Sequence, residues 1–216
     1  MGTLPRISII VPVRSIADYP ESVLRPMRAS TVPAETLLVE GGNIASARNW
    51  GVARTRGDWL VFMDDDIEVN GDLGTLEGLP GDYAVPIHRI RVRDWYSYLG
   101  TGFVNWITRI HWVPFTAGSM TAVRRTAFFP FDEDVVFEDV NWGFEAFRRR
   151  LRWARWRVEA IAHRRYNPFL FDRRRLTLPR RPHHGLYFAG PDAAPVPVGD
   201  GSGLIGRPTV AGPSRA

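Results

Sequence analysis

The chain of 216 residues contains no cysteine and no lysine, so all 28 of its basic residues are arginines. The absence of cysteine excludes disulfides, thiolate nucleophiles and thiolate-bound metals. The absence of lysine excludes any chemistry that needs a side-chain amine. No apolar run approaches the ~18 residues that a membrane-spanning helix needs, and the N-terminus lacks the layout of a signal peptide. We therefore expect a cytoplasmic protein.

The apolar content is sufficient for one packed domain. Hydrophobic residues make up 44% of the chain and include eight tryptophans, which is typical of a folded globule. We expect a single domain over residues 1–190, because a chain of this length favours one core. After about Gly190 the sequence becomes rich in Pro, Gly, Ala and Ser, so residues 191–216 are predicted to form a tail or lid.

Strands and helices are expected to alternate in the first part of the chain. Apolar runs of strand length occur at Ile7–Val13, Thr36–Glu40 and Trp59–Met63. A short helix is predicted over Tyr19–Ala29. A second helix is capped by Asn43 and runs to about Arg54, with Gly57 as its stop. This alternation implies right-handed crossovers between parallel strands, and therefore an α/β fold.

The second half of the chain is less regular. It is predicted to hold further strands at Tyr83–Val92, Ser119–Val123 and Arg155–Ala162. A helix is expected from about Val140 to Trp153. Glu138 and Asp139 stand at its start, where the helix dipole favours negative charge.

Three consecutive carboxylates follow the predicted strand Trp59–Met63. Asp64, Asp65 and Asp66 would then lie at the carboxyl edge of a sheet, where ligands bind in open α/β folds. Clustered carboxylates repel one another unless a cation neutralises them. The pattern favours a Mg²⁺ or Mn²⁺ site shared with substrate phosphates. A solvated acidic loop is the alternative.

Five segments carry a resemblance that covers roughly Ile7 to Tyr166. They are Ile7-Ser-Ile-Ile-Val-Pro-Val13, Asn43-Ile-Ala-Ser-Ala-Arg-Asn-Trp-Gly51, Gly57-Asp-Trp-Leu-Val-Phe-Met-Asp-Asp-Asp66, Ala117-Gly-Ser-Met-Thr-Ala-Val-Arg-Arg125 and Phe131-Asp-Glu-Asp…Phe137-Glu-Asp-Val-Asn-Trp-Gly143. In this order they resemble family 2-type glycosyltransferases of the GT-A fold. One departure is that Val39-Glu-Gly-Gly42 stands where the family usually has Asp-Asp-Gly-Ser.

The resemblance implies both a fold and an activity. The fold is α/β, with a Rossmann-like, mostly parallel central sheet flanked by helices, a nucleotide-sugar half at about residues 1–70 and an acceptor half at about residues 80–190. The activity is metal-dependent, inverting transfer of one sugar of the hexosyl type from a UDP- or GDP-sugar to an acceptor hydroxyl. The Gln-x-x-Arg-Trp signature of processive synthases is missing, so single-sugar transfer is expected. The identities of the sugar and the acceptor stay open.

The resemblance also implies a donor site. Asp66 is expected to ligate Mn²⁺ or Mg²⁺, with Asp64 contacting the metal or the ribose. His163, after a predicted strand, is expected to complete the metal or diphosphate site. Further donor contacts are assigned to Pro12, Glu40, Arg48 and Asp65. Among these, Glu40 takes the nucleoside-binding role of the missing Asp, and Asp65 is expected to point away from Asp64 along the strand.

A glycosyl transfer needs a base for the proton of the acceptor hydroxyl. Asp139 is the candidate base, with a helix-capping carboxylate as the alternative interpretation. Glu138 is expected to support the helix start or to contact acceptor hydroxyls. His183 and His184 are considered as parts of a closing lid.

Two other classes remain as alternatives. Asp64-x-Asp66 after a strand also resembles the nucleophile motif of haloacid dehalogenase-type phosphatases. That motif usually stands near the N-terminus and works with a lysine, which this chain lacks. A nucleic-acid-binding module built on the arginine-rich C-terminal third is the second alternative, although it leaves the acidic motifs unexplained.

Two surface segments suggest partners. The arginine-rich run Arg148–Arg157 is expected to be a solvated face or to recruit a polyanion, such as nucleic acid, an anionic membrane or a lipid-phosphate acceptor. The aromatic stretch Trp95–Phe115 fits a sugar-stacking platform, a core segment or an interfacial membrane contact. No obligate protein partner is inferred, and peripheral membrane contact is a second option for localisation.

Overall fold

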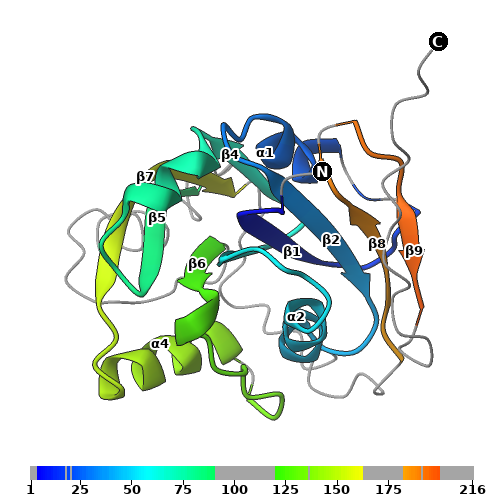
Figure 1. The fold of residues 1–216 in the computed structure, drawn as a ribbon. Coiled ribbons are helices and arrows are strands. Elements are labelled where there is room, and N and C mark those ends of the chain that lie inside the picture. Colours follow the sequence, from blue (N-terminus) through cyan, green and yellow to red (C-terminus); the bar gives the residue numbers. More distant parts are fainter. Residues whose placement is uncertain are drawn as a thin grey trace.

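The computed structural model describes residues 4–17, 19, 21–90, 120–135, 137–162, 182–190 and 192–199. Within these residues a nine-stranded sheet runs in the order β4-β7-β5-β6-β3-β1-β2-β8-β9 (Figure 1). The strands are β1 (Ile7–Val13), β2 (Ala34–Glu40), β3 (Trp59–Met63), β4 (Ile67–Asn70), β5 (Tyr83–Ile90), β6 (Met120–Arg124), β7 (Trp153–Ala162), β8 (His184–Phe188) and β9 (Val196–Val198). The helices are α1 (Arg25–Arg28), α2 (Ile44–Val52) and α4 (Glu138–Arg148), with 3-10 turns η1 (Glu21–Val23), η2 (Leu73–Gly78) and η3 (Arg125–Ala127).

The centre of the sheet is parallel. β1 pairs in parallel with β2 and with β3, so that Ile7 lies opposite both Ala34 and Trp59. β6 and β8 flank these strands in antiparallel orientation. The strands β1 and β3 have the predicted bounds, and β2 begins at Ala34 rather than Thr36. The predicted α/β architecture with a parallel sheet at its centre is confirmed.

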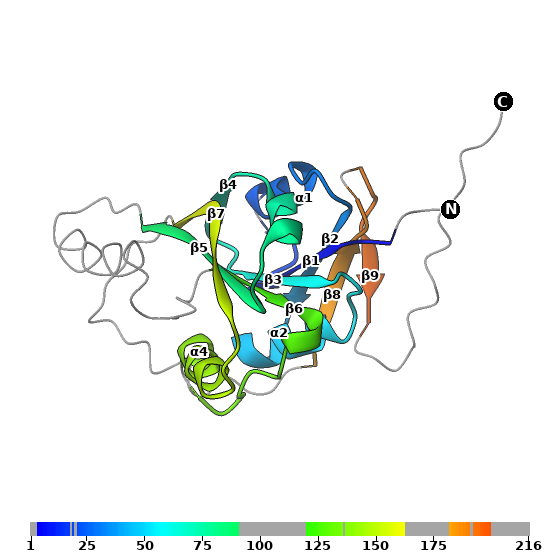
Figure 2. The same ribbon diagram turned by 60° about the vertical axis from the view of Figure 1, so that its left-hand side comes forward.

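Each face of the sheet carries its own hydrophobic core. On one face, Val23 and Met27 from η1 and α1 pack with Ile9 of β1 and with Trp156 of β7. On the other face, α2 and α4 contribute Ala45, Ala47, Trp142 and Ala146, which pack with apolar residues of β1, β3 and β5. Figure 2 shows α2 and α4 on the same side of the sheet and α1 on the opposite side. Because both faces are covered, the central strands are continuous apolar runs.

The helices are shorter than the sequence predicts. The region expected as one helix, Tyr19–Ala29, contains η1 followed by a single turn, α1, whose first turn holds Pro26. Proline lacks the backbone N–H that would continue a helix from the preceding turn. α4 ends at Arg148, not near Trp153, because the segment from Trp153 alternates between exposed and buried residues as strand β7. Within the described residues, no helix is long and apolar enough to cross a membrane.

Two strands at the edge were not expected from the sequence. β8 pairs antiparallel with β2, and β9 pairs with β8. Val198 of β9 is buried in the core that contains α2 and α4. The segment expected as a tail or lid therefore contributes a strand to the sheet, and its residues 200–216 lie outside the described part. His184 belongs to β8, which corrects the interpretation of this residue as part of a lid.

Candidate active site

The carboxyl ends of β1, β2 and β3 meet at one edge of the sheet. In the parallel register, Val13 of β1 lies opposite Glu40 of β2, and Ile10 of β1 lies opposite Phe62 of β3. Continuing the second register places Asp64 at the level of Pro12. The predicted donor residues Pro12, Glu40 and Asp64 are thus brought to the same edge, where open α/β sheets bind ligands.

The acidic triplet forms the turn between β3 and β4. The backbone N–H of Ile67 donates to the carbonyl of Asp64 at 3.4 Å, which closes the turn. All three aspartates are half-buried, so the alternative of a fully solvated acidic loop does not describe them. Ile67 pairs with Ala162 at the end of β7. The triplet is therefore held between the centre of the sheet and its outer strands.

Arg48 of α2 joins the triplet to the start of α4. Its Nη2 donates to Oδ1 of Asp64 at 3.0 Å, and its Nη1 donates to Oε1 of Glu138 at 2.9 Å. The Arg48 side chain is only 4% exposed, and those of Asp64 and Glu138 are each 12% exposed. The guanidinium group also lies 5.3 Å from the ring centroid of Phe131. Two carboxylates from distant elements thus share one buried cation.

This position differs from the one expected for Arg48. The sequence assigned it to the donor phosphates, but two of its nitrogens are committed to carboxylates inside the protein. These two hydrogen bonds use two of the five N–H donors of the guanidinium group, so a contact with the donor phosphates stays a prediction. The geometry therefore indicates that Arg48 positions Asp64 and Glu138.

Neighbouring residues of α2 hold this helix against β1 and against the segment at Phe131. Asn49 donates from Nδ2 to the carbonyl of Phe131 at 2.9 Å and accepts from the N–H of the same residue at 2.9 Å. A Cβ at Gly51 would lie 2.5 Å from Cγ2 of Ile10, so glycine lets α2 approach β1 closely. Asn43 caps the helix in a reciprocal pair with Ser46, as predicted. Asn49 is a positioning residue that the sequence analysis missed, although its motif was recognised.

Asp139 lies in the first turn of α4, directly after Glu138. The N-cap of α4 is Phe137, and no side chain caps this end. Asp139 is therefore not the N-cap residue itself, and its role as the base stays a prediction. Its side chain is half-buried. The candidate base Asp139 therefore directly follows a residue that is linked to Asp64 of the triplet through Arg48.

Glu40 has partners on two other segments. Its Oε2 accepts from the backbone N–H of Ile16 at 2.8 Å and lies 3.5 Å from Nε2 of His184. Gly41 and Gly42 follow with φ of 108° and 60°, and a Cβ on Gly42 would meet the imidazole of His183 at 2.3 Å. His183 packs against this glycine pair and against Trp50, and burial lowers its pKa. His183 is thus a packed residue, which corrects its interpretation as part of a lid.

The comparisons with known proteins agree with this arrangement. Residues 36–129 match glycosyl transferase family 2. This segment runs from β2 to just beyond β6 and includes Arg48 and the triplet. Over this segment the chain is similar to family 2 glycosyltransferases, and its α/β sheet agrees with their GT-A fold. The match ends before Glu138 and Asp139, so it does not bear on these two carboxylates.

Solved structures share the fold of this chain at low sequence identity. The structure of S. aureus TarS 1-349 superposes with a TM-score of 0.54 and 15% identity, covering 73% of this chain and 60% of that one. Its complex with UDP superposes with a TM-score of 0.54 at 13% identity, with the same coverage. A mycobacterial protein gives a TM-score of 0.50 and 16% identity, covering 76% and 69%. The chain spans 60% of the length of these TarS structures, and no curated protein sequence matches it.

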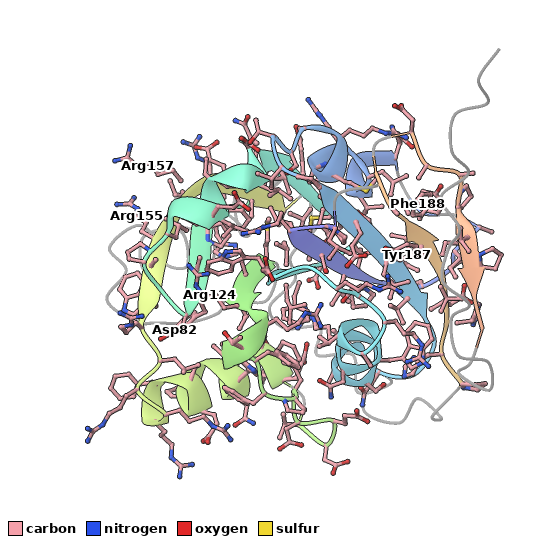
Figure 3. The ribbon with its side chains drawn as sticks, viewed as in Figure 1. Asp82, Arg124, Arg155, Arg157, Tyr187 and Phe188 are labelled. Carbon is pink, nitrogen blue, oxygen red and sulfur yellow. The ribbon has the colours of Figure 1, made fainter. Side chains whose placement is uncertain are left out.

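The paired arginines of the fourth family-like segment hold backbone segments of the fold together. Arg124 donates to the carbonyls of Gly81 and Leu79, each at 2.9 Å. Figure 3 shows Arg124 close to Asp82, whose carbonyl accepts from the Arg124 backbone. Arg125 donates to the carbonyls of Gly57 and Val52 at 2.8 and 3.0 Å. Both arginines lie at the edge opposite the triplet, because β6 ends where β3 begins.

A divalent cation fits the carboxylates at this edge of the sheet only with further ligands from a substrate. Asp64 and Asp66 supply hard carboxylate oxygens, which suit Mg²⁺ and Mn²⁺. In the described part of the chain, however, no three His, Asp or Glu side chains are grouped as a metal cluster. A cation here would take its other ligands from water and phosphate, as Mg²⁺ commonly does. His163, the third predicted ligand, lies outside the described residues, as does the aromatic stretch Trp95–Phe115.

Proposed function

We propose that the domain transfers one sugar from a nucleotide-diphosphate sugar to an acceptor hydroxyl, with inversion at the anomeric carbon. One observation carries the proposal, which is the bridge that Arg48 makes between Asp64 and Glu138. Arg48 and Glu138 are 90 residues apart in the sequence. The bridge supports the proposal because it links Asp64 of the triplet to Glu138, the neighbour of the candidate base Asp139, and a direct displacement needs these groups near one another.

In this proposal Asp66 and Asp64 would hold Mn²⁺ or Mg²⁺. Such a cation supplies countercharge to the diphosphate as the glycosidic bond breaks. Asp64 has fewer free lone pairs for a metal, because one of its carboxylate oxygens already accepts a hydrogen bond from Arg48. Asp66 therefore remains the main ligand. His163 stays a predicted third ligand, and His163→Ala should raise the Mn²⁺ concentration needed for half-maximal activity.

Asp139 would accept the proton of the acceptor hydroxyl while the acceptor oxygen attacks the sugar. Glu138, tied to Arg48, would fix the start of α4 and so the position of Asp139. The side chain of Asp139 is half-buried, which is compatible with access from the acceptor side. The family match favours this transfer over the phosphatase and the nucleic-acid module considered from the sequence.

The donor is proposed to be a UDP-sugar or a GDP-sugar. A TarS structure with this fold was solved in complex with UDP, so UDP-sugars are the first donors to test. Glu40 is proposed to contact the nucleoside. Its carboxylate already accepts from Ile16, which would leave one oxygen for the donor.

The test is a screen of nucleotide sugars for Mn²⁺-dependent hydrolysis and for transfer to simple hydroxyl acceptors. We expect release of one nucleoside diphosphate that stops with EDTA and with Asp66→Asn. The matched control is Asp58→Asn, which alters an exposed aspartate at the opposite edge that pairs with Arg6. Equal nucleoside-diphosphate affinity with and without EDTA would refute the metal assignment. Absence of hydrolysis and transfer with every UDP- and GDP-sugar would refute the donor class.

A further inference from the structure

The outer face of α4 carries exposed phenylalanines. Phe137, Phe144 and Phe147 are 56%, 54% and 67% exposed. They stand at positions i, i+7 and i+10, which lie on one side of a helix. The opposite side of α4 is buried through Trp142 and Ala146. The helix is therefore apolar on both its inner and its outer side, and only the inner side faces the core.

Exposed arginines follow α4 in the chain, at the turn to β7 and along β7. The side chains of β7 alternate, and Trp156 and Val158 pack into the core that contains α1. Arg155 and Arg157 therefore project from the other face of the sheet, which is the face on which α4 lies. Figure 3 shows both arginines pointing outward from β7. Arg150, at the turn between α4 and β7, is exposed as well.

The exposed arginines near α4 differ in their ion pairs within the described part of the chain. Arg148 and Arg149 both pair with Glu145. Within the described part of the chain, no ion pair includes Arg150, Arg155 or Arg157. The surface thus combines apolar rings with uncompensated positive charge.

We propose that this surface, formed by Phe137, Phe144, Phe147, Arg150, Arg155 and Arg157, binds an anionic lipid membrane. Phenylalanine has no hydrogen-bonding group, so it gains most from entering the boundary between headgroups and acyl chains. The arginines are attracted by the negative surface potential of anionic lipids. Nucleic acid would match the arginines, but it offers no apolar layer for rings on the outside of a helix.

The orientation follows from the place of the surface in the fold. It begins at Phe137, which directly precedes Glu138 and Asp139. A membrane bound there lies beside the acceptor end of the site. The proposal does not depend on the proposed function, since binding to lipid needs no sugar donor.

The test is co-sedimentation of the full chain with vesicles of phosphatidylcholine, with and without phosphatidylglycerol. We expect binding only when phosphatidylglycerol is present, and weaker binding as salt is added. The double variant Arg155→Gln and Arg157→Gln should bind roughly tenfold more weakly or worse, since each charge near an anionic surface contributes measurably. Phe144→Ser with Phe147→Ser should reduce binding by roughly tenfold as well, because two inserted rings are lost.

The matched control is Arg25→Gln with Arg28→Gln, which removes the same charge from α1 on the opposite face of the sheet. This control should bind vesicles within about twofold of the unaltered chain, since its charges lie away from the proposed contact. An equal loss in the control would show non-specific attraction and overturn the proposal. Preferential binding of single-stranded oligonucleotides through the same residues, or a phenylalanine-dependent dimer without vesicle binding, would overturn it too. Circular dichroism melts establish that each variant is folded, and the arginine pair alone decides the matter if the serine variant unfolds.

Discussion

Arg48 and Arg125 illustrate two uses of the same side chain at opposite edges of one sheet. Arg48 is buried and donates to two carboxylates, Asp64 and Glu138. Arg125 is half-buried and donates to two backbone carbonyls and to the hydroxyl of Thr55. Burial lowers the pKa of Arg125, and the charges of nearby Glu35 and Asp58 oppose this effect.

The partners decide what each arginine does. Carbonyls belong to the backbone, so Arg125 fixes the loop that leads into β3 and creates no new charged group. Carboxylates are chemically active, so Arg48 sets the position of groups that can contact a donor, an acceptor or a metal. Under the proposed function, the carboxyl edge of the sheet would carry the chemistry, while Arg125 at the amino edge contributes to stability. The predictions below test this division, from the largest expected effect to the smallest.

The largest effect is expected from Asp139→Asn. The change removes a basic oxygen without altering the size of the side chain, and Phe137, not Asp139, is the N-cap. Folding and Mn²⁺-dependent donor binding should stay normal, while transfer slows by roughly 10²–10⁴-fold, the usual contribution of a positioned base. Initial rates at saturating donor and metal provide the measurement. A rate within a few-fold of the unaltered enzyme would exclude Asp139 and turn attention to Glu138.

The variants Arg48→Met and Arg125→Met test the difference between the two arginines. Arg48→Met leaves two mostly buried carboxylates without their cationic partner and should lower the free energy of unfolding by about 3–5 kcal/mol. Arg125→Met leaves two carbonyls and a hydroxyl without a donor and should lower it by about 1–3 kcal/mol.

Activity separates the two variants. Per folded molecule, Arg48→Met should lose transfer rate by roughly tenfold or more because the base and the triplet are no longer held together. Arg125→Met should keep its rate. Urea melts and active-site-normalised rates measure the two effects. The division between the two edges fails if the Arg125 variant loses as much rate as the Arg48 variant.

A substitution of Glu35 should change the stability of the fold but not the affinity for the donor. This buried residue of β2 accepts hydrogen bonds from Ser8, from the backbone N–H of Gly57 and from Tyr187. Burial and the hydrogen bond to Glu35 raise the pKa of Tyr187, which stays a neutral donor. Glu35→Gln places an amide donor among these donors and should destabilise the fold by about 1–3 kcal/mol. The measurement is a chemical melt beside a donor-binding assay, in which an altered affinity for the nucleotide would contradict the prediction.

The smallest effect concerns the edge strand β9. Val198 is 7% exposed and Val196 is 45% exposed on the same strand. Val198→Ala should lower the free energy of unfolding by about 1–2 kcal/mol, since two buried methyl groups are lost. Val196→Ala should change it by less than about 0.5 kcal/mol. Equal melting temperatures for the two variants would show that β9 contributes nothing to the core.

The predictions from the sequence were accurate where structure is local. The bounds of β1 and β3 follow from continuous apolar runs, and the cap of α2 follows from Asn43. The prediction of one helix over Tyr19–Ala29 was wrong, because Pro26 restricts the helix to a single turn. Gly57 was interpreted as a helix stop, but α2 ends at Val52. A Cβ on Gly57 would lie 2.5 Å from the backbone nitrogen of Ser8, so this glycine serves the crossing of two segments.

The candidate site could be predicted only in part. The triplet and the Glu138-Asp139 pair stand out because carboxylates cluster at the end of a strand and at the start of a helix. The role of Arg48 could not be predicted, since an arginine in a helix has the same local signal whether it binds a phosphate or two carboxylates. Asn49 was missed for the same reason, because its partner Phe131 is 82 residues away.

The sequence by itself determined the strands, the caps, the acidic triplet and the order of family-like segments, because these depend on local periodicity and on neighbouring residues. Only the tertiary structure decided that β8 and β9 extend the sheet, that Arg125 serves the scaffold and that Arg48 joins Asp64 to Glu138. These features come from contacts between residues far apart in the chain. Such contacts depend on the packing of both faces of the sheet, and no short segment of sequence contains that information.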